Sequence, residues 1–320
     1  MRRRALLVFL DGVGVGPADA SVNATLVADL PTLDGLLPER PSRSAPRQTG
    51  AAGHAAAVAL DAVLDTPGLP QSGTGQAALL TGVNAARRFG RHFGPWTPVS
   101  LRPLVAEESL LAVAARAGRL VAFANAYPEE IISAVGTRRP PMPLRAGPVI
   151  AALGAGLLTR STPALERGDA IASDITNGGW REHLGRADVP DIGAAAAGRN
   201  LARIALDHDL TLFAHYSTDK AGHAGELSAA GRSLERVDAF LGGLLAALDG
   251  SVLVVVASDH GNIEDARAGH TRNPALGLVV GDGAGAFAEG LGAITDVAPA
   301  LLRAVGVEPS APAEDPAAAS

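Results

Sequence analysis

Short apolar runs bounded by turn or polar residues most constrain the fold of this chain. Residues 251–257 give the clearest run, with Val-Leu-Val-Val-Val inside it, and residues 5–10 and 210–216 give two more. A continuous apolar run of this length is typical of a strand buried on both faces, as in a parallel sheet covered by helices. Helical patterns separate the runs, for example at residues 109–117 and 228–248. The alternation predicts an α/β fold with a mostly parallel sheet.

The rhythm of strands and helices weakens in the middle of the chain. Residues 129–199 are rich in proline, glycine and arginine. We interpret this segment as an insertion that forms a small cap, and residues 1–128 and 200–307 as the core. Residues 308–320 have the composition of a disordered end. Aromatic residues make up 3% of the sequence and hydrophobic residues 47%, so small apolar side chains must fill the core.

Charge and residue content exclude several classes of function. The net charge is -6, whereas non-specific binding to nucleic acid needs a basic face. The sequence has no cysteine, which excludes disulfides, thiolate metal sites and thiol nucleophiles. The first apolar run is shorter than the ~7–15 residues of a signal peptide, and no run approaches the ~18 residues that cross a membrane. We therefore expect a cytoplasmic protein that binds neither nucleic acid nor membrane.

One pair of polar residues has the spacing of metal ligands. Asp219 lies just after the predicted strand at residues 210–216, and His223 follows four residues later. If a helical turn begins there, both side chains project from the same face. A carboxylate and an imidazole together suit Zn²⁺ or Mn²⁺.

Further candidate ligands lie at the ends of other predicted strands. Asp259 and His260 directly follow the clearest strand, Asp11 follows the first strand, and His270 lies in the loop before a strand predicted at residues 276–280. A lone histidine is more often structural than a ligand. The carboxyl ends of parallel strands, however, lie at one edge of a sheet. Taken together, these residues predict a metal centre at that edge.

The segment Gln71-Ser72-Gly73-Thr74-Gly75 offers two hydroxyl groups just before a predicted helix. Ser72 and Thr74 could cap this helix. Either could also be a nucleophile, because the amino end of a helix is suited to binding phosphate. We expect backbone N–H groups of residues 73–75 to contact a bound phosphate.

These segments resemble the alkaline phosphatase superfamily of metalloenzymes, over most of the chain outside residues 129–199. Within that superfamily the chain looks most similar to the branch of cofactor-independent phosphoglycerate mutase and phosphopentomutase. The similar motifs are Asp259-His260-Gly261-Asn262, His270-Thr271-Arg272-Asn273-Pro274, the pair Asp219 and His223, and the loop that starts at Asp11. The resemblance implies a three-layer core of the alkaline phosphatase type with a mostly parallel sheet.

The resemblance also implies how two divalent metal ions, Mn²⁺ or Zn²⁺, divide their ligands. One set is Asp219, His223 and His270, and the other is Asp11, Asp259 and His260. The nucleophile lies between the two sets and bridges both ions. Superfamily members often carry an apolar-Thr-Gly ending ten residues after the nucleophile, and counting back from Leu80-Thr81-Gly82 selects Ser72 over Thr74.

Some positions depart from the pattern of the superfamily. Gln76 stands where the phosphomutases usually have histidine, and Thr74 and Gln76 occupy positions at which sulfatases need proline and arginine. We expect Gln76 and Arg181 to contact the substrate. The segment at residues 129–199 is much smaller than the second domain of phosphoglycerate mutase.

The resulting functional prediction is a two-metal phosphoryl-transfer enzyme that acts on a small phosphoester through a phosphoserine. We expect it to be a phosphoester hydrolase. One alternative is a phosphomutase that acts on a sugar phosphate. An alternative from a different class is a non-catalytic protein that binds metal or phosphate, for which Ser72 would not be needed.

Overall fold

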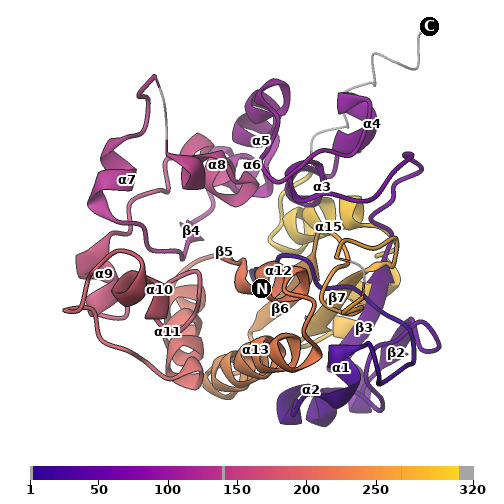
Figure 1. Cartoon of the computed structure of the whole chain (residues 1–320). Helices are drawn as coiled ribbons and strands as arrows, with labels where there is room; N and C mark the ends of the chain where they lie inside the picture. The colour runs from indigo at the N-terminus through magenta and orange to yellow at the C-terminus, as the bar shows by residue number, and fades with distance from the viewer. Residues whose placement is uncertain (1–2, 139–140, 268, 310–320) are drawn as a thin grey trace, which may run out of the picture.

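The computed structural model describes residues 3–138, 141–267 and 269–309. Its strands are, in chain order, β1 (Arg4–Leu10), β2 (Arg47–Thr49), β3 (Ala55–Leu60), β4 (Val121–Phe123), β5 (Leu210–His215), β6 (Val252–Ser258) and β7 (Ala275–Val280). They form a seven-stranded sheet in the order β2-β3-β7-β6-β1-β5-β4 (Figure 1). The strands β3, β6, β1, β5 and β4 run in one direction, and β2 and β7 run in the other. The predicted α/β fold with a mostly parallel sheet is confirmed.

The central strand β1 shows why helices must cover both faces of this sheet. Its side chains alternate, so that Leu7 and Phe9 pack into one core while Leu6 and Val8 pack into another. All four are fully buried. A strand that is apolar on both sides is stable only if each face is covered, and this produces three layers.

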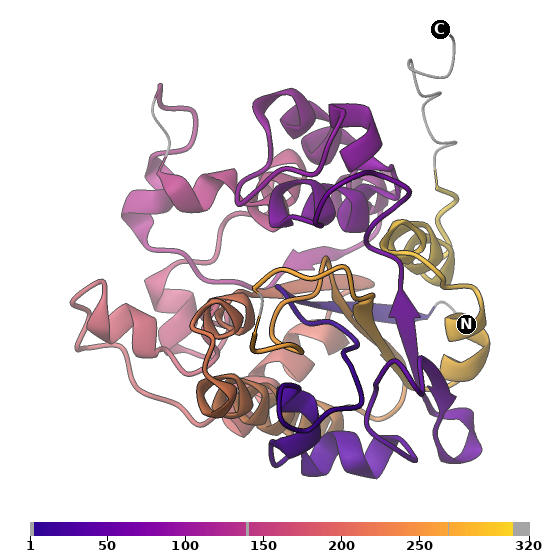
Figure 2. The ribbon, with the colours of Figure 1, turned by 45° about the vertical axis from the view of Figure 1, so that its right-hand side comes forward.

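Helices lie on both sides of the sheet, as Figure 2 shows. One layer contains α3 (Ser72–Thr81), α5 (Arg102–Glu108), α6 (Leu110–Arg116), α8 (Gly147–Gly154), α14 (Ala284–Glu289) and α15 (Val297–Ala304). The other contains α1 (Ala24–Val27), α2 (Pro31–Leu36), α11 (Ala194–Leu206) and α13 (Leu227–Ala247). The remaining short helices are α4 (Ala85–Phe89), α7 (Glu129–Ser133), α9 (Thr162–Glu166), α10 (Gly178–Glu182), α12 (Ser217–His223), η1 (Ala51–Gly53), η2 (Val99–Leu101), η3 (Met142–Arg145) and η4 (Ile294–Asp296).

Small residues allow the helices α11 and α13 to approach each other closely. A Cβ atom at Gly198 would lie 2.1 Å from the carbonyl oxygen of Phe240, and one at Gly243 would lie 2.1 Å from that of Ala195. Neither position has room for a side chain. In this layer, small residues rather than large aromatic side chains fill the space, and the helix backbones pack closely.

The predicted insertion at residues 129–199 contributes to more than one part of the structure. Its helix α8 packs against α3 and α5 in the core layer. A small separate core of Ala126, Leu165, Ala170, Ala172, Trp180 and Val189 lies around α9 and α10. The predicted boundary at residue 200 falls inside α11, which begins at Ala194. The division into a core and an inserted cap remains a prediction.

Two further sequence-based predictions concern the C-terminal tail and the absence of a membrane-spanning helix. Most of the tail predicted to be disordered at residues 308–320 lies outside the described residues, which end at residue 309. None of the described helices combines the length and the apolar character that crossing a membrane requires.

Candidate metal centre

Three neighbouring parallel strands end side by side and bring the predicted ligands together. Leu10, the last residue of β1, is paired with His215 of β5 on one side and with Ser258 of β6 on the other. Asp11 and Asp259 follow directly, and α12 begins just after β5. The side chains that follow these strands therefore meet at one edge of the sheet, where ligands bind in open α/β sheets.

The first group of candidate ligands consists of Asp11, Asp259 and His260. One atom from each lies within 4.8 Å of the others, and all three residues are buried. Nε2 of His260 lies 3.2 Å from Oδ1 of Asp11 and 3.8 Å from Oδ2 of Asp259. Two carboxylates and an imidazole in this arrangement form a suitable donor set for a divalent metal ion.

The second group consists of Asp219, His223 and His270, again with ligand atoms within 4.8 Å of one another. Asp219 and His223 project from the same face of α12, and Nε2 of His223 lies 3.4 Å from Oδ2 of Asp219. The Nε2 atoms of His223 and His270 are 3.1 Å apart. The loop before β7 therefore folds back and brings His270 to the sheet edge.

The two groups are adjacent. The rings of His260 and His270 have centroids 4.1 Å apart, and Oδ1 of Asp219 lies 4.0 Å from Nε2 of His260. Asp219 therefore lies between the groups. The structure brings together all six candidate ligands, in the same two groups that the resemblance implied, and their role as ligands remains a prediction.

Burial and neighbouring charges shift the pKa values of these side chains strongly. Burial raises the pKa of Asp11, and it raises that of Asp259 well above its usual range. Burial acts to lower the pKa of His260, but the nearby carboxylates of Asp259 and Asp11 outweigh it and raise this pKa to about 10. Burial also opposes ionisation of Asp219, yet its contacts with His270 and His260 bring its pKa down to about 2.

The polar contacts around His260 fit a bound cation better than a hydrogen-bond network. Oδ2 of Asp259 and Oδ1 of Asp11 are buried, and neither has a partner with hydrogen-bond geometry in the described residues. Nε2 of His260 can carry one proton at most, yet Ser72 and both carboxylates converge on it. Buried polar atoms without partners are rare in proteins. A metal ion between these atoms would satisfy them.

Ser72 is the first residue of α3, and its Oγ atom lies 3.0 Å from Nε2 of His260. It also lines a cavity of about 330 Å³ together with Asp11 and Asp219. Thr74 is directed elsewhere, because its Oγ1 atom accepts a hydrogen bond from the N–H of Phe93 at 3.1 Å. The structure therefore brings Ser72, and not Thr74, to the ligand groups and the cavity.

The expectation for the backbone of residues 73–75 needs a correction. The N–H of Thr74 donates to the carbonyl oxygen of Phe93 at 2.9 Å, and the N–H of Gly75 donates to that of Gln71 at 2.8 Å. These two donors are already paired within the protein. They do not meet a phosphate without breaking those bonds.

The two predicted substrate contacts differ in position. Gln76 is buried and lines the same cavity, where its Nε2 atom donates to Oδ2 of Asp11 at 3.4 Å and its Oε1 atom accepts from the N–H of Gly147 at 3.0 Å. Arg181 is exposed on α10 and does not line this cavity. Trp180 fills the buried side of that short helix. The geometry therefore supports a role near the site for Gln76 but not for Arg181.

Glu264 is a residue of the site that the sequence analysis missed. Its side chain is fully buried, with Oε2 accepting from the N–H groups of Gly14 and Asn262, at 3.0 and 2.7 Å. Oε1 accepts from Oγ1 of Thr271 and Nδ2 of Asn273, at 2.6 and 3.1 Å. The carboxylate thus ties together the three loops that carry Asp11, Asp259 with His260, and His270. A carboxylate two residues after the Asp-His-Gly-Asn motif was the available signal.

Two further residues hold Asp219 in position. Nδ2 of Asn262 donates to Oδ1 of Asp219 at 2.6 Å. Gly12 has φ of +68°, and a Cβ atom there would lie 2.6 Å from the same oxygen. Only glycine adopts this conformation at low cost and leaves room for the carboxylate.

Residues 190–309 match the family model described as Metalloenzyme superfamily. The 2,3-bisphosphoglycerate-independent phosphoglycerate mutase of Roseobacter denitrificans (strain ATCC 33942 / OCh 114) is 38% identical over 118 residues, which are 34% of this chain and 23% of that protein. The protein of the same name from Paracoccus denitrificans (strain Pd 1222) is 37% identical over 131 residues, 38% of this chain and 25% of that protein. The matched part of the chain thus spans about a quarter of the length of these relatives.

Solved structures with low sequence identity share the fold. The PH0037 protein from Pyrococcus horikoshii has a TM-score of 0.56 and 14% identity, with 95% of this chain and 97% of that chain covered. The alkaline phosphatase from the Antarctic bacterium TAB5 has a TM-score of 0.50 and 13% identity, with 95% and 98% covered. The family match of residues 190–309 and the two similar mutases confirm the resemblance predicted from the motifs, and these two structures show the fold.

Proposed function

We propose that this chain, whose residues 190–309 form a Metalloenzyme superfamily domain, is a phosphoester hydrolase that works through a phosphoserine at Ser72. One observation carries the proposal. The Oγ atom of Ser72 lies 3.0 Å from Nε2 of His260 and lines a cavity of about 330 Å³. A nucleophile needs groups beside it that can balance negative charge and an adjacent space for the substrate, and this hydroxyl has both.

Six side chains would hold two divalent ions, Mn²⁺ or Zn²⁺. Asp11, Asp259 and His260 would hold one, and the other would be held by Asp219, His223 and His270. Ions of this kind lower the pKa of a hydroxyl that they contact and neutralise charge on phosphoryl oxygens. Ligation requires neutral imidazoles and ionised carboxylates, so His260 would lose a proton when its ion binds.

The reaction is a double displacement at phosphorus. Oγ of Ser72 loses its proton and forms a bond to phosphorus while the bond to the oxygen of the leaving alcohol breaks, and that oxygen takes up a proton. Water then attacks the phosphoserine, inorganic phosphate departs and Ser72 regains its hydroxyl proton. Gln76 holds Asp11 through one amide atom and α8 through the other, which fixes one wall of the cavity.

Hydrolysis and intramolecular transfer differ only in what accepts the phosphoryl group. Relatives of part of the chain are named phosphoglycerate mutases, so a phosphomutase acting on a sugar phosphate is the second candidate. A mutase must hold its substrate away from water while it reorients. Helix α8 of the segment at residues 129–199 packs in the core layer, and the other described helices that lie wholly within this segment, α7, α9, α10 and η3, are short. This favours water as the acceptor.

The test is a panel of phosphomonoesters incubated with protein loaded with Mn²⁺ or Zn²⁺. We expect release of inorganic phosphate from 4-nitrophenyl phosphate, and a phosphorylated peptide containing Ser72 after acid quenching. Conversion of a sugar phosphate to its isomer without release of phosphate would show a mutase. Binding of about two metal ions with neither activity would show a non-catalytic protein.

A further inference from the structure

The cavity at Ser72 adjoins a second cavity of about 630 Å³. Five residues line both cavities, namely Tyr127, Pro143, Ser173, Tyr216 and Lys220. The two spaces therefore meet at a common wall. A phosphoryl group at Ser72 occupies the smaller space, so the rest of a substrate extends toward this wall.

Aromatic side chains are concentrated around these cavities. The sequence has only two tyrosines and two tryptophans. Tyr127 and Tyr216 line both cavities, while Trp96 lines the smaller one and Trp180 the larger. All four side chains also pack against the hydrophobic cores, so one side of each ring is held by the protein while another part lines a cavity. Flat rigid walls of this kind suit a flat carbon frame.

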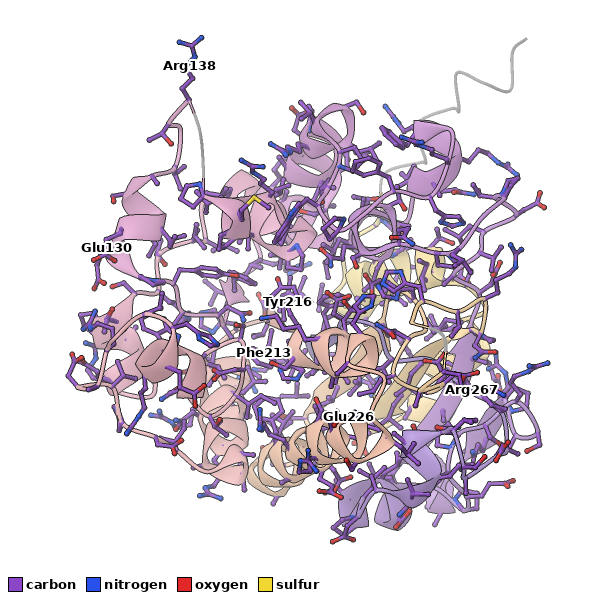
Figure 3. All side chains as sticks on the ribbon, viewed as in Figure 1. Glu130, Arg138, Phe213, Tyr216, Glu226 and Arg267 are labelled. Atoms are coloured by element: carbon purple, nitrogen blue, oxygen red, sulfur yellow. The ribbon has the colours of Figure 1, made fainter. Side chains whose placement is uncertain are left out.

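The hydroxyl of Tyr216 lies at the common wall, beside the hydroxyl of Tyr127. It is buried and has no partner with hydrogen-bond geometry in the described residues. Tyr216 lies near the middle of the molecule in Figure 3, whereas Glu130 and Arg138 project from its edge. Burial raises the pKa of Tyr216 well above its usual range, so the group keeps its proton. A substrate acceptor would satisfy it.

Lys220 is the only lysine among the 27 lysine and arginine residues of the sequence. It lies on α12 directly after Asp219, and its side chain is exposed. Within the described part of the chain it forms no ion pair with a carboxylate. Among the described residues that line the smaller cavity it is the only cation, and the two carboxylates there, Asp11 and Asp219, belong to the proposed metal sites. A lysine offers a compact charge with rotatable donors, which arginine does not.

We propose that this wall is a leaving-group subsite for a flat ring that carries an anionic substituent. Lys220 pairs with the anion, Tyr216 donates a hydrogen bond to it, and Trp96 and Tyr127 contact the ring. The subsite rests on the proposed function, which places the phosphoryl group at Ser72. Three carboxylates, Asp174, Glu182 and Asp191, line only the larger cavity, against one arginine, Arg236, so the net charge there disfavours an anion placed farther from Lys220. The favoured substrates are therefore aryl phosphates with a carboxylate or similar group on the ring.

Phosphonates test this subsite without turnover. Metal-loaded protein is titrated with phenylphosphonate, 4-carboxyphenylphosphonate, ethylphosphonate and phosphonoacetate, and binding is followed by calorimetry and by tryptophan fluorescence. We expect 4-carboxyphenylphosphonate to bind most tightly. Lys220→Met should weaken its binding about fivefold, the range of a partly exposed ion pair, and leave phenylphosphonate unchanged.

Matched variants separate the subsite from general effects. Lys220→Arg should retain most of the preference for the carboxylate, and Arg232→Met, an exposed cation on α13 outside both cavities, should change nothing. The subsite is overturned if Lys220→Met weakens the binding of both aryl phosphonates equally, or if it weakens the binding of neither. It is also overturned if phosphonoacetate binds more tightly than 4-carboxyphenylphosphonate. If the phosphonates bind as expected but no phosphoester is turned over, the proposed hydrolase function is wrong and the subsite stands.

Discussion

The Oγ atom of Ser72 and the Nε2 atom of His260 lie 3.0 Å apart although 188 residues separate them in the chain. Ser72 begins α3, on one face of the sheet, and His260 follows β6 at the edge where three parallel strands end. The amino end of a helix and the carboxyl end of a strand thus meet at one point. The loop after the strand carries candidate ligands for the metal ions proposed here, and the first residue of the helix places its hydroxyl beside them.

Replacing Ser72 by alanine should abolish turnover. The variant lacks the hydroxyl that lies beside His260 and is proposed as the nucleophile, so we expect release of phosphate to fall by at least about a thousandfold. The metal content, measured by elemental analysis, should stay near two ions per chain because six ligands remain. Thr74→Val is the control, since the Thr74 hydroxyl contacts the backbone of Phe93. An active Ser72→Ala with an inactive Thr74→Val would assign the nucleophile to Thr74.

Metal ions should stabilise the protein, and Asp259 should be required for much of this effect. A ligand that binds only the folded state at about a hundred times its Kd adds about 2.7 kcal/mol to the free energy of unfolding. We therefore expect the Tm to fall on chelation and to recover with Mn²⁺ or Zn²⁺. Asp259→Asn should reduce the recovery, whereas Asp65→Asn, which changes an exposed carboxylate, should not. A Tm that changes neither on chelation nor on addition of metal would count against the proposed metal centre.

Glu264→Gln should destabilise the protein although it changes few atoms. The carboxylate accepts four hydrogen bonds, and the amide nitrogen of glutamine would face two of these donors instead of accepting from them. Leaving buried donors unpaired costs about 1–3 kcal/mol each. We expect urea unfolding to show this loss, and metal titration to show weaker binding because three ligand loops lose their common anchor. Glu289→Gln, at an exposed position, is the control and should behave as wild type.

His215 should make the protein less stable in acid. It is fully buried at the end of β5, and burial lowers its pKa from 6.5 to about 4, partly opposed by the bond from Nδ1 to the carbonyl oxygen of Ser173. The unfolded chain binds this proton below about pH 6.5, but the folded chain does so only near pH 4. Stability is therefore lost as the pH falls through this window, by about 3 kcal/mol in total.

The measurement for His215 is urea unfolding of chelated protein at pH 7 and pH 4.5. His215→Asn should show a smaller loss of unfolding free energy between these values than wild type does. His183→Gln, which changes an exposed histidine, should keep the wild-type loss. The same loss in His215→Asn would show that other groups account for the acid sensitivity.

Local pattern was enough to predict several parts of this protein. The apolar runs of β1, β5 and β6 specify strands buried on both faces, since nearly all of their residues are buried in the structure. The spacing of Asp219 and His223 places both on one face of α12. Hydrophobic periodicity and neighbour spacing are properties of short segments, so a sequence carries them directly. Motif resemblance then predicted the two sets of candidate ligands and the choice of Ser72, and the structure brings these side chains close together.

Tertiary structure alone decided which distant groups share a site. Glu264 reads as an ordinary acidic loop residue, yet burial among three loops makes it their common acceptor. Lys220 and Ser72 line one cavity, and Arg181, predicted to contact substrate, is turned to solvent. These outcomes depend on the order of the strands and on how loops close over the sheet edge. Both are set by long-range packing, which no short segment of sequence contains.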